Sequence, residues 1–427
     1  MPTNENESCS FCGHPRNEVP GGKLIRGGSS LICADCSISA SEILGRSLKE
    51  PKKDEVTIGT PKVIKAHLDQ HIIAQERLKR TVSTAVYHHF KRRSTVGIHN
   101  ANDVEIQKSN MIVMGPSGSG KTETFRALSK YLRIPFYVQD CTRITQQGYV
   151  GDDAEDMLRG LIQDAGGDVK RAEWGIVLMD EWDKLARKSG RSASGYRDVS
   201  GEGVQQGLLR ILEGAKVPVT RGMGKHSSVT TVGADGQVKS NVDIIDTTNI
   251  LFAFAGSFAG IEEIVERRIN RKSRLGFGSQ ENEKKKLTIN DSYDHVLPED
   301  VLEFGIIPEL LGRLPIITST HELSESDMVR VLTEPKNAIV RQFQALFAMD
   351  GVTLEFEPEA LLEIGREAKK RPTGARSLRS IVEETLASYS FDLPGEDVVG
   401  LRITPESICG RGAAVVTRQN VVNVRLA

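Results

Sequence analysis

The sequence predicts an α/β fold in which helices flank a parallel sheet, with a small helical region after it and a short cysteine-rich module before it. Three observations lead to this prediction. Short apolar runs, which are typical of buried strands, alternate with helical patterns over most of the chain. One of these runs enters a glycine-rich turn that opens a helix, and another ends in two carboxylates. Near the N-terminus, four of the six cysteines fall into two C-x-x-C pairs.

The composition is that of an ordinary globular protein, with 26% charged and 38% hydrophobic residues among 427. A net charge of −1 gives no electrostatic reason to expect binding to nucleic acid or to an anionic membrane. No apolar run reaches the roughly 18 residues that a membrane-spanning helix needs. The polar start of the chain lacks the apolar centre of a signal peptide, so we expect a cytoplasmic protein.

The four paired cysteines are Cys9 and Cys12, then Cys33 and Cys36. Two C-x-x-C pairs at this spacing predict a tetrahedral Zn²⁺ site with four thiolate ligands. Redox-active dithiols and disulfides are the alternatives, and the presence of two matched pairs favours zinc. Four protein ligands leave no position for water, so the zinc would be structural. Such a short module buries little apolar surface, and the metal would supply its folding energy.

The next stretch, residues 49–63, is rich in charge and carries prolines, which indicates a linker. Further along, "PFYVQD", "NILFAFAGSF" and "LPIITST" are apolar runs that fit strands of one sheet. From about Ser319 onward the pattern is helical. The β-branched end of the chain, "GAAVVTRQNVVNVRLA", is typical of an edge strand or a tail.

The glycine-rich turn follows the apolar run "MIVM" and has the pattern G-x-x-x-x-G-K-T. Backbone N–H groups of such a loop surround phosphate oxygens, and the helix that follows adds its dipole. Lys121 would reach the β- and γ-phosphates of ATP, and the Thr122 hydroxyl would bind Mg²⁺. The candidate nucleotide-binding residues of this loop are Gly115, Pro116, Ser117, Gly118, Ser119, Gly120, Lys121, Thr122 and Glu123.

A second apolar run, "GIVLM", ends in Asp180 and Glu181. A buried parallel strand delivers its last residues to the carboxyl edge of the sheet, where ligands bind. Asp180 would hold Mg²⁺, and Glu181 would orient and deprotonate the attacking water. A helix N-cap is the alternative for an isolated acid pair, but the phosphate loop favours catalysis. Ser257, after a later strand, could sense the γ-phosphate or could be a simple turn residue.

Several longer motifs make the sequence similar to the AAA+ protein unfoldases of the ClpX family. The similarity covers nearly the whole chain, including the four-cysteine module. It implies a zinc-binding domain at 1–48, a linker at 49–63, a large ATPase subdomain at 64–318, and a small subdomain with a tail at 319–427. The matching motifs are "HLDQHIIAQERLKR", "GPSGSGKT", "GYVGDD", "GIVLMDEWDKL", "RDVSGEGVQQ", "IIPELLGRLP", "EPKNAIVRQFQALF" and "TGARSLRSIVE".

The resemblance implies further roles at the nucleotide. Ile72, Ile73 and Gln75 match the segment that packs on adenine, and the residue before Gln75 is an alanine where the family usually has glycine. Arg313 matches the arginine finger that reaches the nucleotide of a neighbouring subunit. An ordinary salt-bridged arginine is the alternative for that residue. Arg376 matches the sensor-2 arginine, which couples the small subdomain to the nucleotide.

The resemblance also implies a pore through a ring of six subunits. Tyr149 and Val150, in "GYVG", would grip the polypeptide in the channel. Lys225 and His226 match a loop at the pore entrance, where Gly224 replaces an arginine.

A separate loop would dock on a ClpP-type peptidase. Leu275, Gly276 and Phe277 match the family's Ile-Gly-Phe, and the change of isoleucine to leucine keeps an apolar side chain of similar volume.

These features predict an ATP-dependent unfoldase or chaperone that recognises, unfolds and translocates proteins through a hexameric ring into a ClpP-type peptidase. The cofactors would be ATP, Mg²⁺ and Zn²⁺, and adaptors would bind the zinc domain. One alternative is a similar chaperone that acts without a peptidase. Another is a remodelling ATPase whose zinc module binds nucleic acid. The near-zero charge and the few clustered basic residues of the first fifty disfavour the second alternative, so we expect neither nucleic acid nor membrane as a partner.

Overall fold

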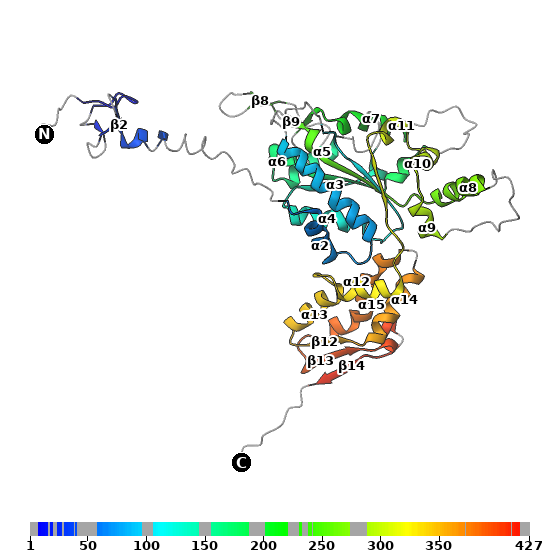
Figure 1. Cartoon of the computed structure of the whole chain (residues 1–427). Coiled ribbons are helices and arrows are strands. Elements are labelled where there is room, and N and C mark those ends of the chain that lie inside the picture. The colour runs from blue at the N-terminus through cyan, green and yellow to red at the C-terminus, as the bar shows by residue number, and fades with distance from the viewer. Residues whose placement is uncertain are drawn as a thin grey trace, which may run out of the picture. The chain divides into compact units, whose positions relative to one another are not determined.

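The computed structural model contains two compact units, Met1–Thr57 and Ile58–Ala427 (Figure 1). None of the described helices combines the length and the apolar character that are needed to cross a bilayer. The structure describes residues 7–15, 18–19, 24–27, 30–37, 39–40, 58–95, 106–144, 155–187, 201–220, 230–232, 238–240, 242–273, 288–371, 373–410 and 412–418.

The first unit is built around a two-stranded antiparallel hairpin of β1 (Leu24–Gly27) and β2 (Ser30–Cys33). Its buried apolar cluster, within the described residues, consists of Cys9, Val19 and Cys33. This cluster is far smaller than the core that an independently stable domain needs. The unit therefore depends on something other than apolar burial for its fold.

The second unit contains a five-stranded sheet in which all neighbouring strands are parallel. The five apolar runs between Met111 and Ser319 from which the sequence predicted strands all lie in this sheet, which confirms the α/β fold. The strand order is β11 (Ile316–Ser319), β3 (Met111–Met114), β10 (Leu251–Gly256), β5 (Ile176–Asp180) and β4 (Phe136–Asp140).

Both faces of the sheet are covered, which explains why its central strands are apolar throughout. Alternate residues such as Ile112, Val177 and Phe252 belong to one hydrophobic cluster with residues of helices on that face. Helix α3 contacts β11, helix α4 contacts β5, and both lie on the opposite face (Figure 1). The helices that contribute to the cluster include α5 (Asp156–Asp164), α7 (Glu202–Glu213), α8 (Ile261–Ser273), α10 (Pro298–Phe304) and α11 (Pro308–Leu311), and those on the opposite face are α3 (Glu76–Thr95) and α4 (Lys121–Leu132).

Shorter elements complete this region. Helix α2 begins at Pro61, so residues 61–63, which the sequence placed in the linker, form the first turn of a helix. The exact domain limits at 48, 63 and 318 stay predictions. The remaining elements are α2 (Pro61–Asp69), α6 (Val169–Ala172), α9 (Ile289–Asp294) and two antiparallel hairpins, β6 (Lys216–Thr220) with β9 (Val242–Asp246) and β7 (Thr230–Val232) with β8 (Val238–Ser240).

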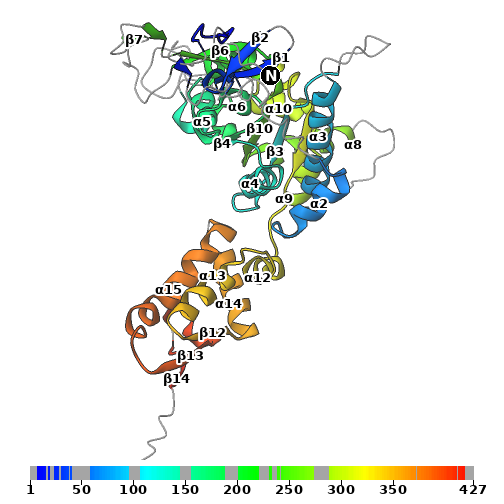
Figure 2. The ribbon, with the colours of Figure 1, turned by 90° about the vertical axis from the view of Figure 1, so that its left-hand side faces the viewer.

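The C-terminal region has its own hydrophobic cluster, which extends from Leu323 to Ala414. Four helices gather with a three-stranded sheet at one end of them (Figure 2). The sequence analysis expected helices from Ser319 and a strand only at the chain end, so it was wrong for β12 and β13. The elements are α12 (Glu325–Thr333), α13 (Ile339–Met349), α14 (Pro358–Lys370), α15 (Ser377–Asp392), β12 (Thr353–Phe356), β13 (Val398–Ile403) and β14 (Val415–Arg418).

A buried glutamine joins three segments beneath the sheet. The Gln205 side chain on α7 is fully buried, and its Nε2 donates hydrogen bonds to the carbonyls of Leu185 at 2.8 Å and Gly305 at 3.2 Å. Its Oε1 accepts from the backbone N–H of Ile307 at 2.9 Å. The side chain thus satisfies backbone groups that the fold removes from water.

We predict that Gln205→Leu lowers the free energy of unfolding by about 3 kcal/mol, because it removes the side-chain partner of the buried Leu185 carbonyl and of the Ile307 N–H, while the Gly305 carbonyl keeps its hydrogen bond from the Arg187 N–H. Urea unfolding followed by circular dichroism measures the change. Gln206→Leu is the matched control, since the next residue of the same helix is exposed. Equal stability of the two variants would contradict the structural role of Gln205.

Candidate functional site

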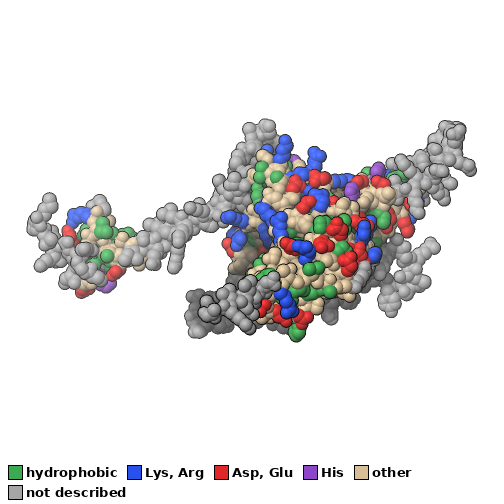
Figure 3. Space-filling model, turned by 90° about the horizontal axis from the view of Figure 1, so that it is seen from below, with side chains coloured by type: hydrophobic (Ala, Val, Ile, Leu, Met, Phe, Trp, Pro, Cys, Tyr) green, Lys and Arg blue, Asp and Glu red, His purple; other side chains and the backbone are tan. Residues whose placement is uncertain are grey.

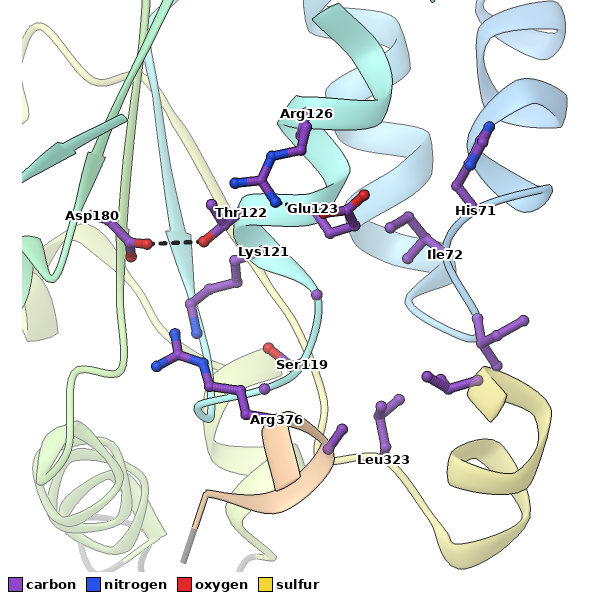
Figure 4. Close-up of a pocket in the computed structure, with 15 residues that line it drawn as sticks. His71, Ile72, Ser119, Lys121, Thr122, Glu123, Arg126, Asp180, Leu323 and Arg376 are labelled. Carbon is purple, nitrogen blue, oxygen red and sulfur yellow. Dashed lines mark hydrogen bonds and ion pairs between the residues drawn. The ribbon is translucent and has the colours of Figure 1, made fainter. Parts of the chain in front are cut away.

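A cavity of about 450 Å³ lies where the phosphate loop, the segment before α3 and the C-terminal region meet (Figure 4). Polar and charged groups gather at the loop, and apolar side chains line the remainder. The lining residues are His71, Ile72, Ile73, Gly118, Ser119, Gly120, Lys121, Thr122, Glu123, Arg126, Asp180, Leu323, Val331, Ala375 and Arg376.

The loop before α4 requires glycine for reasons of conformation and space. Gly115 has a φ of 140°, and a Cβ atom there would lie 2.1 Å from the Thr320 Oγ1. Gly120, at the start of α4, has a φ of 91°. The Ser119 hydroxyl lies 2.7 Å from the Thr320 hydroxyl and donates to the Pro116 carbonyl at 2.8 Å. The loop is therefore held as a rigid turn with its backbone free to surround an anion.

Lys121 is the first residue of α4, and its ammonium lies inside the loop. Its Nζ donates to the carbonyls of Gly115 at 2.7 Å and Pro116 at 2.8 Å. Burial lowers the pKa of Lys121 to about 8, the Asp180 carboxylate opposes this shift, and Arg376 adds to it. The side chain is still mostly protonated at neutral pH. A buried cation at a helix N-terminus fits phosphate oxygens.

Two oxygen ligands suited to Mg²⁺ lie beside Lys121. The Thr122 Oγ1 donates to the Asp180 Oδ2 at 2.8 Å, and the Asp180 side chain comes from the end of β5 (Figure 4). Hydroxyl and carboxylate oxygens are the donor set that this hard cation prefers. The pair therefore fits the metal.

Glu181 follows Asp180 with a left-handed φ of 55°, and its side chain is exposed and does not line the cavity. Its backbone N–H donates to the Asp180 Oδ1 at 3.0 Å. Strained backbone of this kind is common next to functional groups.

Ile72 and Ile73 belong to the apolar part of the cavity lining. That they pack on adenine stays a prediction. Gln75 does not line the cavity. Its amide Nε2 donates to the His321 carbonyl at 2.8 Å, and its Oε1 accepts from the His321 N–H at 2.9 Å. Ala74 has a φ of 54°, a conformation that glycine adopts without strain.

The two predicted arginines occupy different places. Arg376, in the short helix η6 (Gly374–Arg376), lines the cavity, and its guanidinium points toward Lys121 (Figure 4). Arg313, after α11, lies outside the cavity lining, pairs with Glu213 and donates to the Glu309 carbonyl at 2.6 Å. Within one chain, then, only one of the two can contact a nucleotide in this cavity.

Several predicted residues lie outside the described part of the chain. They belong to the loops that the resemblance assigned to the pore and to peptidase docking: Tyr149, Val150, Lys225, His226, Leu275, Gly276 and Phe277.

The four cysteines of the first unit form one cluster. All four sulfurs lie within 4.8 Å of one another, and those of Cys12 and Cys33 are 3.8 Å apart. Zn–S bonds of about 2.3 Å in a tetrahedron place sulfurs roughly 3.8 Å apart, so the cluster fits zinc. These sulfurs are not joined in disulfides.

The electrostatics of the cluster also fit a metal. A hydrogen bond from the backbone of Cys12 lowers the pKa of Cys9 to about 6, which favours a thiolate. The Cys33 sulfur, through its hydrogen bond, raises the pKa of Cys36 to about 12. Four thiolates become compatible only beside a cation.

Sequence reasoning missed several residues that line the cavity. Leu323, Val331 and Ala375 come from the C-terminal region, His71 directly precedes Ile72, and Arg126 follows the phosphate loop on α4. His71 and Ala375 adjoin predicted residues within matched motifs, which is the signal that could have identified them. The contributions of Leu323 and Val331 depend on how distant segments pack.

Comparisons with known families match three parts of the chain. The model of the ClpX C4-type zinc finger matches residues 7–46, and that of the AAA domain (Cdc48 subfamily) matches residues 106–317. The C-terminal D2-small domain of ClpB protein matches residues 323–394. With the geometry above, these matches identify ATP, Mg²⁺ and Zn²⁺ as the cofactors.

Similar proteins extend over almost the whole chain. The ATP-dependent Clp protease ATP-binding subunit ClpX of Treponema denticola is 41% identical over 420 residues, which cover 97% of this chain and 94% of that protein. The subunits of the same name from Borrelia duttonii and Borrelia recurrentis are each 42% identical over 407 residues, covering 94% of this chain and 91% of theirs. The chain therefore belongs to the ClpX family of AAA ATPases with an N-terminal four-cysteine zinc finger.

Proposed function

We propose that this chain is an ATP-dependent protein unfoldase that acts as a hexameric ring and passes unfolded proteins to a ClpP-type peptidase. The observation that carries the proposal is the cavity itself. It joins Lys121 and the Thr122–Asp180 pair of the large region to Arg376 of the C-terminal region. Nucleotide bound there touches both regions, so its hydrolysis can change how they are held together.

Each residue has a chemical task in this proposal. Mg²⁺, when bound, neutralises charge on the β- and γ-phosphates. Thr122 and Asp180 hold the metal, and Lys121 binds the phosphate oxygens. Glu181 accepts a proton from the attacking water, and its exposure leaves the carboxylate free to move toward that water. Arg376 binds the nucleotide from the C-terminal region.

The position of Arg313 is an argument for the proposed ring. It lies outside the cavity of its own chain, yet a planar guanidinium is well suited to the charge of a transferred phosphoryl group. We assign it to the nucleotide of a neighbouring copy. Sites that are shared between copies close into a ring, and the ClpX family supports six.

The proposed roles of the pore residues, the peptidase-docking loop and the partners are inferred from membership of the ClpX family. Tyr149 and Val150 would grip the substrate, and Lys225 and His226 would meet it at the pore entrance. The loop 275–277 would dock on the peptidase, and the relatives named as subunits of the Clp protease support this partner. Adaptors would bind the zinc domain, and we place the protein in the cytoplasm.

The distribution of charge on the described surface bears on a nucleic-acid partner. On the face in Figure 3, the described Lys and Arg side chains are interspersed with Asp and Glu side chains. The chain has a net charge of −1, and the described residues of this face do not form the basic stripe that is typical of nucleic-acid binding.

Glu181 is the residue whose change tests the proposed catalysis. Glu181→Gln should bind ATP normally and lower kcat at least about 100-fold, because the amide cannot accept the proton from water. Steady-state hydrolysis and equilibrium binding of a fluorescent ATP analogue measure the two effects. Glu359→Gln, the same change at an exposed site on α14, should leave both unchanged. Normal turnover in Glu181→Gln would remove this residue from the mechanism.

Zinc content tests the cysteine cluster. The wild type should bind one Zn²⁺ per chain, and Cys33→Ser should lose it and unfold the first unit, whose core is too small without the metal. Metal analysis and limited proteolysis measure this. Cys141→Ser, a change of a buried cysteine outside the cluster, should retain the zinc. Full zinc content in Cys33→Ser would refute the ligand set.

Degradation of a tagged fluorescent protein tests the whole proposal. The wild type should degrade it only with both ATP and ClpP. Tyr149→Ala should keep ATP hydrolysis within about twofold and lose unfolding, because a methyl group cannot grip the substrate. Phe277→Ala should keep unfolding and lose degradation. If the wild type unfolds the substrate but never delivers it to ClpP, the chain is a peptidase-independent chaperone.

A further inference from the structure

A buried carboxylate lies beside the catalytic acids and has no task in the mechanism above. Asp183 belongs to the short helix η4 (Trp182–Leu185), and its side chain is only 4% exposed. Its Oδ1 accepts a hydrogen bond from the Ser257 backbone N–H at 3.1 Å, and its Oδ2 accepts one from the Ser257 hydroxyl at 2.9 Å. The Lys184 Nζ lies 3.5 Å from the Asp183 Oδ2.

The register of the sheet places Ser257 between the phosphate loop and the acid pair. It directly follows β10, in which Gly256 lies opposite Met114 of β3 and Phe254 lies opposite Met179 of β5. The Gly256 carbonyl accepts from the Gly115 N–H at 3.2 Å. Ser257 is therefore level with the start of the loop on one side and with the residues after Asp180 on the other.

The surroundings fix Ser257 from three directions. Asp183 holds its N–H and its hydroxyl, and the Tyr293 hydroxyl donates to its carbonyl at 2.6 Å. A Cβ atom on Gly256 would lie 2.5 Å from the Asp183 Oδ1, so the close approach of the carboxylate depends on glycine. This construction is specific, because a simple turn needs none of these contacts.

The hydrogen bond to Asp183 decides what Ser257 can offer to a ligand. A serine hydroxyl carries one hydrogen, and here the carboxylate takes it. Only the lone pairs of the Ser257 Oγ remain. They cannot donate to a phosphate oxygen, but they can accept a hydrogen bond from water.

We propose that Asp183 is a positioning residue for ATP hydrolysis, which holds the Ser257 hydroxyl as an acceptor for the attacking water. In that step the water oxygen bonds to the γ-phosphorus, the bond from phosphorus to the bridging oxygen breaks, and ADP leaves. One water proton passes to Glu181, and the other hydrogen points at the Ser257 Oγ. The proposal rests on the ATPase site and is independent of the pore and the peptidase.

Asp183→Asn tests whether the direction of the hydrogen bond between Ser257 and Asp183 matters. The amide nitrogen would donate to the Ser257 oxygen, and the hydroxyl hydrogen would then be free to point toward the nucleotide. We expect kcat to fall about tenfold or more, since misoriented water reacts slowly, while the KM for ATP stays within about threefold. Ser257→Ala should lower kcat to a similar extent. In the double variant, Asp183→Asn should change kcat by less than about twofold relative to Ser257→Ala alone.

Asp300→Asn is the control, since it alters another buried carboxylate. The Asp300 Oδ1 lies 2.8 Å from the Arg268 Nε, and neither residue lines the cavity. A similar loss of kcat in this control would mean that Asp183 acts through stability alone and would overturn the proposal. Multiplying effects in the double variant would overturn it too, because Asp183 would then act by its charge on Lys121. If Asp183→Asn does not fold, wild-type kcat in Ser257→Ala overturns the proposal, and a tenfold loss supports it.

Discussion

The parallel register of three strands is the constraint on which the rest of this structure depends. β3, β10 and β5 end at one edge of the sheet, with Met114 opposite Gly256 and Phe254 opposite Met179. A shift of one residue in either pairing would turn alternate side chains to the other face and separate the acid pair from the phosphate loop. Because both faces of the sheet are buried, apolar packing enforces that register, so the stability of the core and the geometry of the site have the same origin.

Charge at this edge is balanced within a small volume. Burial lowers the pKa of Lys121, while Asp180 and Asp183 favour its protonated form and Arg376 opposes it. The C-terminal region thus contributes a positive charge to a site whose negative charges come from the large region. A polyanionic nucleotide relieves the repulsion between the two cations, which gives the two regions an electrostatic reason to hold it jointly.

Much of the site could be predicted from the sequence, because the phosphate loop, the acid pair and the cysteine pairs are local patterns with fixed spacing. Contacts between distant segments could not. The resemblance assigned Gln75 to the segment that packs on adenine, whereas in the structure its amide binds the backbone of His321. No local sequence pattern at either residue predicts these hydrogen bonds. The same holds for Asp183 and Ser257. The sequence did not predict β12, because a strand of four residues has too short a pattern and forms only by pairing with β13, where Leu354 lies opposite Leu401.

The two hydrogen bonds between the Gln75 amide and the His321 backbone couple two parts of the structure. His321 follows β11 and stands where the chain leaves the sheet for the C-terminal helices, and both hydrogen bonds go to its backbone. Rotation of those helices about His321 must either break the two hydrogen bonds or move residues 72–75 with the helices. Ile72 and Ile73 line the apolar end of the cavity, so these two hydrogen bonds connect the start of the C-terminal region to the cavity lining. In the proposed ATPase, movement of the C-terminal helices about His321 is thereby coupled to binding of the nucleotide base, and a bound base restricts that movement in return.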